Sequence, residues 1–247
     1  MDSDGVALCA RFSLATNRLQ YCGPSDAEPD LYAAITRGER VAEARRALER
    51  FEALHPYLAA LGAASGRDPF DREVVEAYWL GNRLLDDFSP EEFRRLLDAL
   101  VRRGLPRSAA ARLAAHLPST TPPCHVFHVA FVGVGEVTGH VETTMRNMEQ
   151  CRPAWATVTA VDGSRLRCRG PTLRLEGGRL RVDGEAESEH AFDPRILPTV
   201  RPGASIALHW NHPALELSAG QLSNLTAYTG RALAAANEAL PSLRALS

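Results

Sequence analysis

The sequence predicts an α+β protein in which a mostly helical N-terminal half precedes a small β-barrel and a C-terminal helix. Three observations support this fold class. Apolar residues recur at three- and four-residue steps through much of residues 31–116. Apolar and polar residues alternate around two glycine-containing turns between residues 154 and 183. A helical pattern returns from about residue 218 to residue 240.

The helical elements follow in order along the N-terminal half. Residues 1–30 show few periodic signals, and Tyr21-Cys22-Gly23-Pro24 is expected to form a turn or loop. The apolar spacing then predicts helices within 31–64 and 70–87. Ser89 caps the next helix, with Pro90 in its first position and two acids in its first turn, and that helix is expected to stop at Gly104. A further helix is expected over 107–116.

The pattern changes after Pro122-Pro123. Residues 125–134 are apolar and rich in valine and phenylalanine, which predicts a strand, and residues 140–150 predict a helix. Two hairpins are expected around Asp162-Gly163 and Gly177-Gly178, and SIALHW (205–210) predicts another strand. We therefore expect two domains, residues 1–150 and residues 151–247, with the boundary at this change in composition.

Composition and charge narrow the possible partners and the compartment. The chain of 247 residues is 45% hydrophobic and 23% charged, with a formal net charge of −2, so neither nucleic acid nor a membrane is expected as a partner. Neither a membrane-spanning run nor a signal-peptide pattern is found, which predicts a cytoplasmic protein. The five scattered cysteines are then expected to be free thiols, some of them metal ligands.

Histidine and cysteine gather in two short segments, CHVFH (124–128) and HWNH (209–212). Imidazole and thiolate are the ligands that zinc and softer transition metals prefer. The candidate metal ligands are Cys124, His125, His128, Cys151, His209 and His212. If residues 125–134 form a strand, His125 and His128 face opposite sides of it, and only one of them can contribute to a given site.

No nucleophile elbow, phosphate-binding loop or paired-carboxylate motif is found in the sequence. Gly133, Gly135 and Gly139 lie where a dinucleotide-binding loop would follow a strand. Their spacing is loose, however, and hairpins follow in place of a second βα unit. A glycine-rich loop is the better interpretation.

The segment from Cys151 to the last helix resembles the HypC-type [NiFe]-hydrogenase maturation chaperones. Cys151 is followed, at matching spacings, by Asp162-Gly163, two hairpins, Arg201-Pro202-Gly203, His209 and a terminal helix. The resemblance covers about a third of the chain and leaves the helical half without a counterpart. It implies that the barrel is OB-like.

The resemblance also implies a function. In that family a cysteine carries an iron centre with cyanide and carbon monoxide ligands, and delivers it to the hydrogenase large-subunit precursor together with other maturation proteins. By this resemblance Cys151 would be the iron ligand or the contact with the large-subunit precursor, and His209 a nearby ligand or support. The protein would then be a non-catalytic metallochaperone.

Two other functions stay open. A metalloenzyme could use a Cys/His site built from the CHVFH and HWNH segments, with Cys22 as a further ligand. That reading requires the two segments to lie close together in space, because ligands lie only about 2.0–2.3 Å from their ion. Alternatively, the chain is a non-catalytic protein-interaction module whose barrel shares only its fold with the chaperones.

Overall fold

The N-terminal half folds into helices, as its apolar spacing predicts. The computed structural model describes residues 2–244. The helices of this half are α1 (Ser3–Arg18), α2 (Glu28–Arg37), α3 (Val41–Leu48), α4 (Leu54–Ser65), α5 (Arg72–Leu80), the 3-10 turn η1 (Arg83–Leu85), α6 (Pro90–Val101) and α7 (Arg107–Ala115). The predicted cap of α6 is confirmed: Ser89 Oγ accepts from the Glu92 N–H, and the Glu92 carboxylate accepts from the Ser89 N–H.

Helix α1 was not predicted, because residues 1–30 carry few periodic signals. This helix is buried on most of its surface, with Phe12 and Leu14 fully inaccessible to solvent. A helix that is apolar around most of its circumference lacks the one-sided pattern by which a surface helix is recognised. Helix α1 packs against α2, α3 and α5 and also touches the last two strands.

The strand expected over residues 125–134 was also wrong, because this segment is helical. A single turn, α8 (His125–Phe127), continues into the π-helical turn η2 (His128–Val132). Residues 124–134 are all buried, and an apolar run buried on every side cannot be assigned to helix or strand by its periodicity. A loop through Gly133, Gly135 and Gly139, each with positive φ, then leads to α9 (Met145–Cys151), which is shorter than expected.

Both predicted hairpins are present in an antiparallel sheet. Its strands are β1 (Ala154–Asp162), β2 (Arg165–Glu176), β3 (Arg179–Ala191), β4 (Ser205–His209) and β5 (His212–Glu216), in the order β3-β2-β1-β4-β5. Gly163 and Gly177 have positive φ, as their turns require. Strand β5 was not anticipated.

The sheet is open, so the architecture is α+β and the expected OB-like barrel is not confirmed. Among the described residues no ladder joins the outer strands β3 and β5. One reason is length: β2 and β3 have 12 and 13 residues whereas β4 and β5 have five each, so the long hairpin extends beyond its neighbours.

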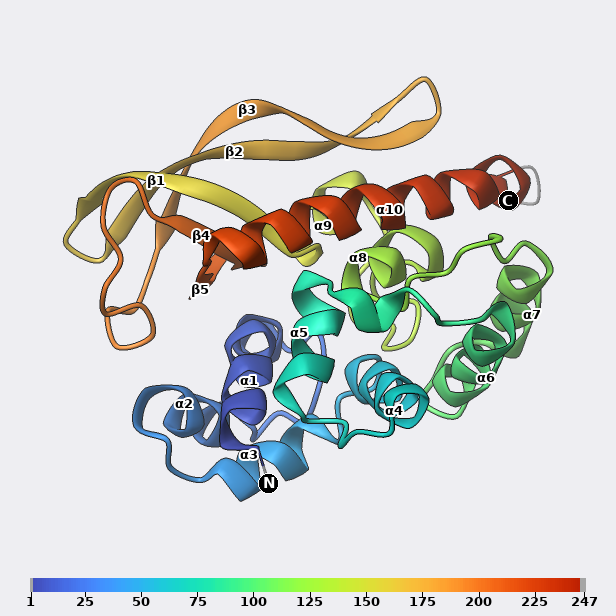
Figure 1. Ribbon diagram of the computed structural model, residues 1–247, viewed down its shortest axis with the longest axis horizontal. Coiled ribbons are helices and arrows are strands. Elements are labelled where there is room, and N and C mark those ends of the chain that lie inside the picture. The colour runs from blue at the N-terminus through green and yellow to red at the C-terminus, as the bar shows by residue number, and fades with distance from the viewer. Residues whose placement is uncertain (1, 245–247) are drawn as a thin grey trace.

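Helix α10 (Ala219–Arg244) joins the sheet to the helical half. Figure 1 shows it running along the sheet with α5 and α8 on its other side, and it contacts β3, α5, α8 and η2. The side chain of Asn237 fixes it to the hairpin, because it accepts from the Leu180 N–H and donates to the Leu180 carbonyl. The buried apolar residues of both halves form one continuous cluster.

None of the helices described for residues 2–244 has the length and apolar character needed to cross a membrane.

Candidate metal centre

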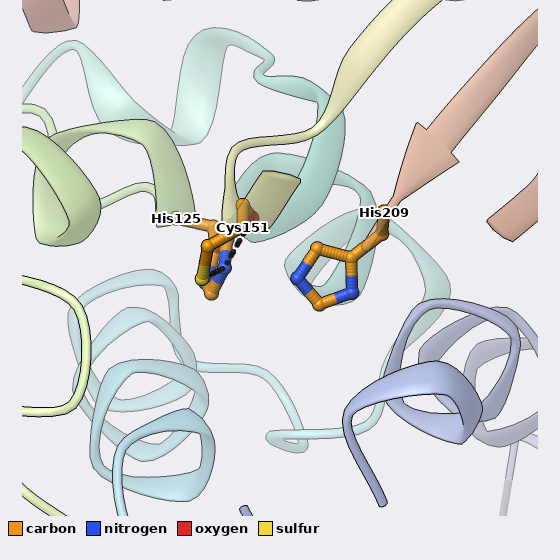
Figure 2. A group of neighbouring side chains, drawn as sticks. All are labelled: His125, Cys151 and His209. Atoms are coloured by element: carbon orange, nitrogen blue, oxygen red, sulfur yellow. Dashed lines mark hydrogen bonds between the residues drawn. The ribbon is translucent and has the colours of Figure 1, made fainter. Parts of the chain in front are cut away.

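Three of the six candidate ligands meet in the interior of the protein. His125, Cys151 and His209 are all buried, and each offers a ligand atom within 4.8 Å of the other two. Figure 2 shows the His209 ring directed toward the pair formed by His125 and Cys151. The ligands come from three separate elements: His125 from α8, Cys151 from the end of α9, and His209 from the end of β4.

A buried arginine fixes the position of Cys151. Arg152 follows it directly, and its side chain is fully inaccessible to solvent. The guanidinium donates two hydrogen bonds to the Glu149 carboxylate and one to the Pro171 carbonyl. Glu149 in turn accepts from the Leu173 N–H. The last turn of α9 is therefore attached to β2, and the Cys151 side chain is left facing the two histidines.

A tight turn places His209. Trp210 and Asn211 both have left-handed backbone conformations, with φ of 52° and 59°, which is the geometry of a two-residue type I′ hairpin. This turn joins β4 to β5. The Trp210 backbone N–H donates to the carbonyl of Gln150, the residue before Cys151. The same turn that ends β4 therefore binds directly to the end of α9.

The hydrogen bonds of His209 define which ring nitrogen is free. Its Nδ1 lies 2.6 Å from the Phe12 carbonyl oxygen, which can only accept, so Nδ1 carries the proton. Nε2 consequently bears the lone pair. That atom is buried, and no residue that the structure describes forms a hydrogen bond with it. A histidine oriented by a carbonyl at one nitrogen, with a free lone pair at the other, has the arrangement typical of metal ligands.

Tyr78 on α5 gives His125 a comparable orientation. The Tyr78 hydroxyl lies 2.7 Å from Nδ1, while Nε2 lies 3.1 Å from the Cys151 carbonyl and 3.5 Å from Cys151 Sγ. A tyrosine hydroxyl can donate or accept. It therefore supports either tautomer: Nε2 can donate to the carbonyl, or Nδ1 can donate to the tyrosine and leave the Nε2 lone pair free.

These separations suit a tetrahedral ion after a small adjustment. With bond lengths of about 2.0 Å to nitrogen and 2.3 Å to sulfur, a tetrahedral ion holds a nitrogen and a sulfur about 3.5 Å apart. The observed distance between His125 Nε2 and Cys151 Sγ is 3.5 Å. All separations in the cluster are within 4.8 Å, so a movement of at most about 1.5 Å would bring His209 to ligand distance.

Burial keeps the cluster uncharged in the absence of an ion. It lowers the pKa of His209 to about 4, against the smaller opposing effect of the Phe12 and Cys151 carbonyls. Burial, and next the nearby imidazoles of His209 and His128, hold the pKa of His125 well below its usual value. Burial also raises the pKa of the Cys151 thiol, and the indole N–H of Trp210 partly opposes that shift. Neutral imidazoles are the form that binds metal, and an ion would displace the thiol proton.

All three ligands line a small cavity of about 60 Å³. Its walls are mainly aromatic and aliphatic and include Tyr78, Trp79 and Trp210 together with valines of the 133–141 loop. A centre with three protein ligands leaves one tetrahedral position vacant, as in catalytic zinc sites. Because the three ligands form part of the cavity wall, that vacant position would face the cavity.

The other candidate ligands do not join the cluster. His128 lines the same cavity, but its Nδ1 is bonded to the Tyr57 hydroxyl at 3.0 Å. Cys124 precedes α8 and is buried outside the three-residue group. His212 pairs with His209 across the β4–β5 turn without reaching the cluster. Cys22 lies on the cavity wall, where its thiol donates to Glu52.

Sequence reasoning missed the aromatic residues around the site. The Trp79 ring lies 4.5 Å from His125 and 5.1 Å from His209, measured between centroids. Tyr78 and Trp79 were recognised only as apolar positions of a helix. Trp210 belongs to the HWNH segment, and its place between two histidines was the one available signal.

Comparison with known proteins gives one match. The sequence profile of a protein family described as a family of unknown function, DUF6390, matches residues 1–242. No curated protein and no solved structure matches the chain.

Proposed function

We propose that this chain, which belongs to the DUF6390 family, holds one transition-metal ion through His125, Cys151 and His209. The observation that carries the proposal is the buried, unpartnered lone pair of His209, directed at a thiol and a second imidazole. Leaving a buried polar atom without a partner costs about 1–3 kcal/mol. An ion at this position would remove that penalty.

The donor set restricts the choice of metal. Two imidazoles and one thiolate suit zinc, iron, cobalt or copper, and do not suit magnesium or calcium, which prefer oxygen ligands. When bound, such an ion supplies a Lewis-acid centre with one vacant position. The protein's own residues orient the two rings through Phe12 and Tyr78, and exclude water by burial.

Metal analysis of the purified protein tests this site. Protein prepared anaerobically should contain one equivalent of metal. Cys151→Ser and His209→Ala should each lower the affinity by at least about tenfold. His212→Ala is the matched control, because it removes the other histidine of the same turn and should keep the metal. Metal that binds equally well to all four proteins would refute the assignment.

The function that this centre serves best is that of a hydrogenase maturation factor. Cys151 and His209 are the two residues that the resemblance to the HypC-type chaperones singles out, and they lie in the same cluster. An antiparallel sheet followed by the terminal helix α10 has the order of elements that the resemblance implies, although the sheet is open and forms no closed barrel. In this role the iron fragment is the cargo, and the large-subunit precursor is the partner that receives it.

Three measurements test the maturation role. Infrared spectroscopy of protein co-expressed anaerobically with the maturation machinery should detect bound cyanide and carbon monoxide. The protein should also form a complex with the large-subunit precursor, and Cys151→Ala should abolish hydrogenase activity in cells. Full hydrogenase maturation with the Cys151→Ala variant would exclude this role, whatever metal the site holds.

A metalloenzyme is the second candidate, and the cavity favours it. The vacant coordination position would face a small, mostly apolar pocket in which a small substrate could approach the ion. Catalytic turnover that requires the metal and persists without any partner protein would favour the enzyme over the delivery role.

A further inference from the structure

The three ligands proposed so far leave the metal centre with one positive charge and one vacant position. This inference rests on the metal site proposed above: a divalent ion bound by the Cys151 thiolate and two neutral imidazoles has a net charge of +1. Burying a net charge without a partner is unfavourable, so a fourth ligand that brings one negative charge would stabilise the centre.

A second thiol lines the cavity that contains the three ligands. It belongs to Cys22, in the loop between α1 and α2. No carboxylate is among the lining residues in the described part of the chain, and the phenols of the tyrosines there are poorer ligands for zinc and softer metals than a thiolate is. His128 also lines the cavity, but a third neutral imidazole would leave the positive charge in place. Cys22 is therefore the lining residue that fits a fourth, negatively charged ligand.

Hydrogen bonds and a ring contact hold the Cys22 loop beside the ligands. The side-chain amide of the buried Asn17 donates to the carbonyls of Cys22 and Pro24, at 3.4 Å and 2.8 Å. The Tyr21 ring packs against the ring of Trp210, with the centroids 4.6 Å apart, so the loop lies next to the β4–β5 turn. The backbone of the loop is thus in place, and only the Cys22 side chain has to turn.

The Cys22 thiol is close to the cluster without belonging to it. Its S–H donates to the Glu52 carboxylate, with Sγ 3.3 Å from Oε2, and Cys22 lies outside the three-residue group. The cavity has room for only a few waters, so its walls face one another over a short distance. After burial, the nearby Cys22 group is the next cause that raises the pKa of the Cys151 thiol, so the two thiols interact. A change of χ1 between staggered rotamers moves a cysteine sulfur by about 3 Å.

We infer that Cys22 is the fourth protein ligand of the metal centre and occupies the position that the other three ligands leave vacant. On binding, the Cys22 S–H bond breaks, a sulfur–metal bond forms, and the proton passes to Glu52, which is partly exposed and releases it to water. The buried, unpartnered lone pair of His209 independently indicates that an ion belongs in this cavity. Two thiolates and two imidazoles make a neutral centre, and a substrate or a receiving partner must displace Cys22 to reach the ion.

X-ray absorption spectroscopy counts the sulfur ligands without any substitution. The full chain is loaded anaerobically with one equivalent of cobalt(II), and two sulfur and two nitrogen ligands are expected. A single sulfur ligand with cobalt fully bound would overturn the inference and leave the three-ligand site standing. Failure to bind cobalt at all would refute the proposed function together with the inference.

The cobalt absorption spectrum gives a second measure. The intensity of thiolate-to-cobalt charge transfer increases with the number of thiolates bound, so Cys22→Ser at saturating cobalt should show about half of the wild-type intensity. Cys168→Ser is the matched control: Cys168 is also a free cysteine, but it lies on β2 outside the cavity, and its replacement should leave the spectrum unchanged. Equal intensity in Cys22→Ser and the wild type would overturn the inference.

Discussion

Replacing His209 by phenylalanine should stabilise the metal-free protein and abolish its stabilisation by metal. Phenylalanine keeps the planar ring and removes both nitrogens. The hydrogen bond from Nδ1 to the Phe12 carbonyl, worth about 1 kcal/mol, is lost. That carbonyl lies within α1, where it can also accept from the N–H four residues later, so it keeps a partner.

The expected gain in folding stability comes from removing His209 Nε2, which is buried without a hydrogen-bond partner. Removing an unpaired buried polar atom relieves about 1–3 kcal/mol. The net expectation is a metal-free variant more stable than the wild type by about 1 kcal/mol, which raises Tm by about 3 °C in a chain of this size. A metal ion at a thousand times its Kd should stabilise the wild type by about 4 kcal/mol and the variant not at all.

Thermal and urea denaturation, with chelator and then with zinc, provide the measurement. His190→Phe is the matched control: His190 is also buried, but its Nδ1 is bonded to the Asn211 carbonyl and its Nε2 to Ser188 Oγ. Losing two hydrogen bonds with no compensating relief should destabilise that variant by about 2 kcal/mol. If metal-free His209→Phe is destabilised as much as His190→Phe, His209 is a structural histidine and the reasoning fails.

Three further predictions concern the surroundings of the centre. Burial lowers the pKa of His128 to about 4, so as the pH falls this histidine binds a proton in the unfolded chain before it does so in the folded protein. The free energy of unfolding of the metal-free protein should therefore decrease by about 2 kcal/mol between pH 7.5 and pH 5 because of this group. Urea titrations of His128→Leu should show a correspondingly smaller dependence of stability on pH. Tyr78→Phe should weaken metal binding by about tenfold in competition titrations with a chelator, because the His125 ring loses its orienting partner, and an unchanged affinity would contradict that role. Gly135→Ala should lower Tm by several degrees, because φ is +77° and a Cβ would lie 1.8 Å from the Val141 carbonyl oxygen, whereas Gly139→Ala, with a similar φ of +72° and open space around it, should lower Tm less.

The sequence was most informative where local chemistry alone determines structure. The Ser89 cap, the Gly163 and Gly177 turns and the alternation in β1 to β3 depend on neighbouring residues, and all three features were predicted correctly. Helix α1 and the segment α8–η2 were not, because both are buried on nearly all sides and carry no one-sided pattern.

For the candidate site, the sequence predicted the ligand types but not which of the candidates lie together in space. His125, Cys151 and His209 were chosen for their residue types, and their ligand atoms do lie within 4.8 Å of one another. Neighbours in sequence were a poor guide to the rest of the set, because His128 is bonded to Tyr57. Whether residues 1–150 and 151–247 are separate domains stays a prediction, but the site draws one ligand from the first range and two from the second.

The hydrogen bond from the Trp210 N–H to the Gln150 carbonyl joins two of the three ligand-bearing segments before any ion is present. A metal ion held by His125, Cys151 and His209 would then act as a cross-link between distant parts of the chain, comparable to a disulfide that a reducing environment cannot open. A protease that cleaves the loop between η2 and α9 would leave two fragments held together by the ion. The continuous buried apolar cluster also holds these fragments together, so chelation would lower the stability of the cleaved protein without separating its parts.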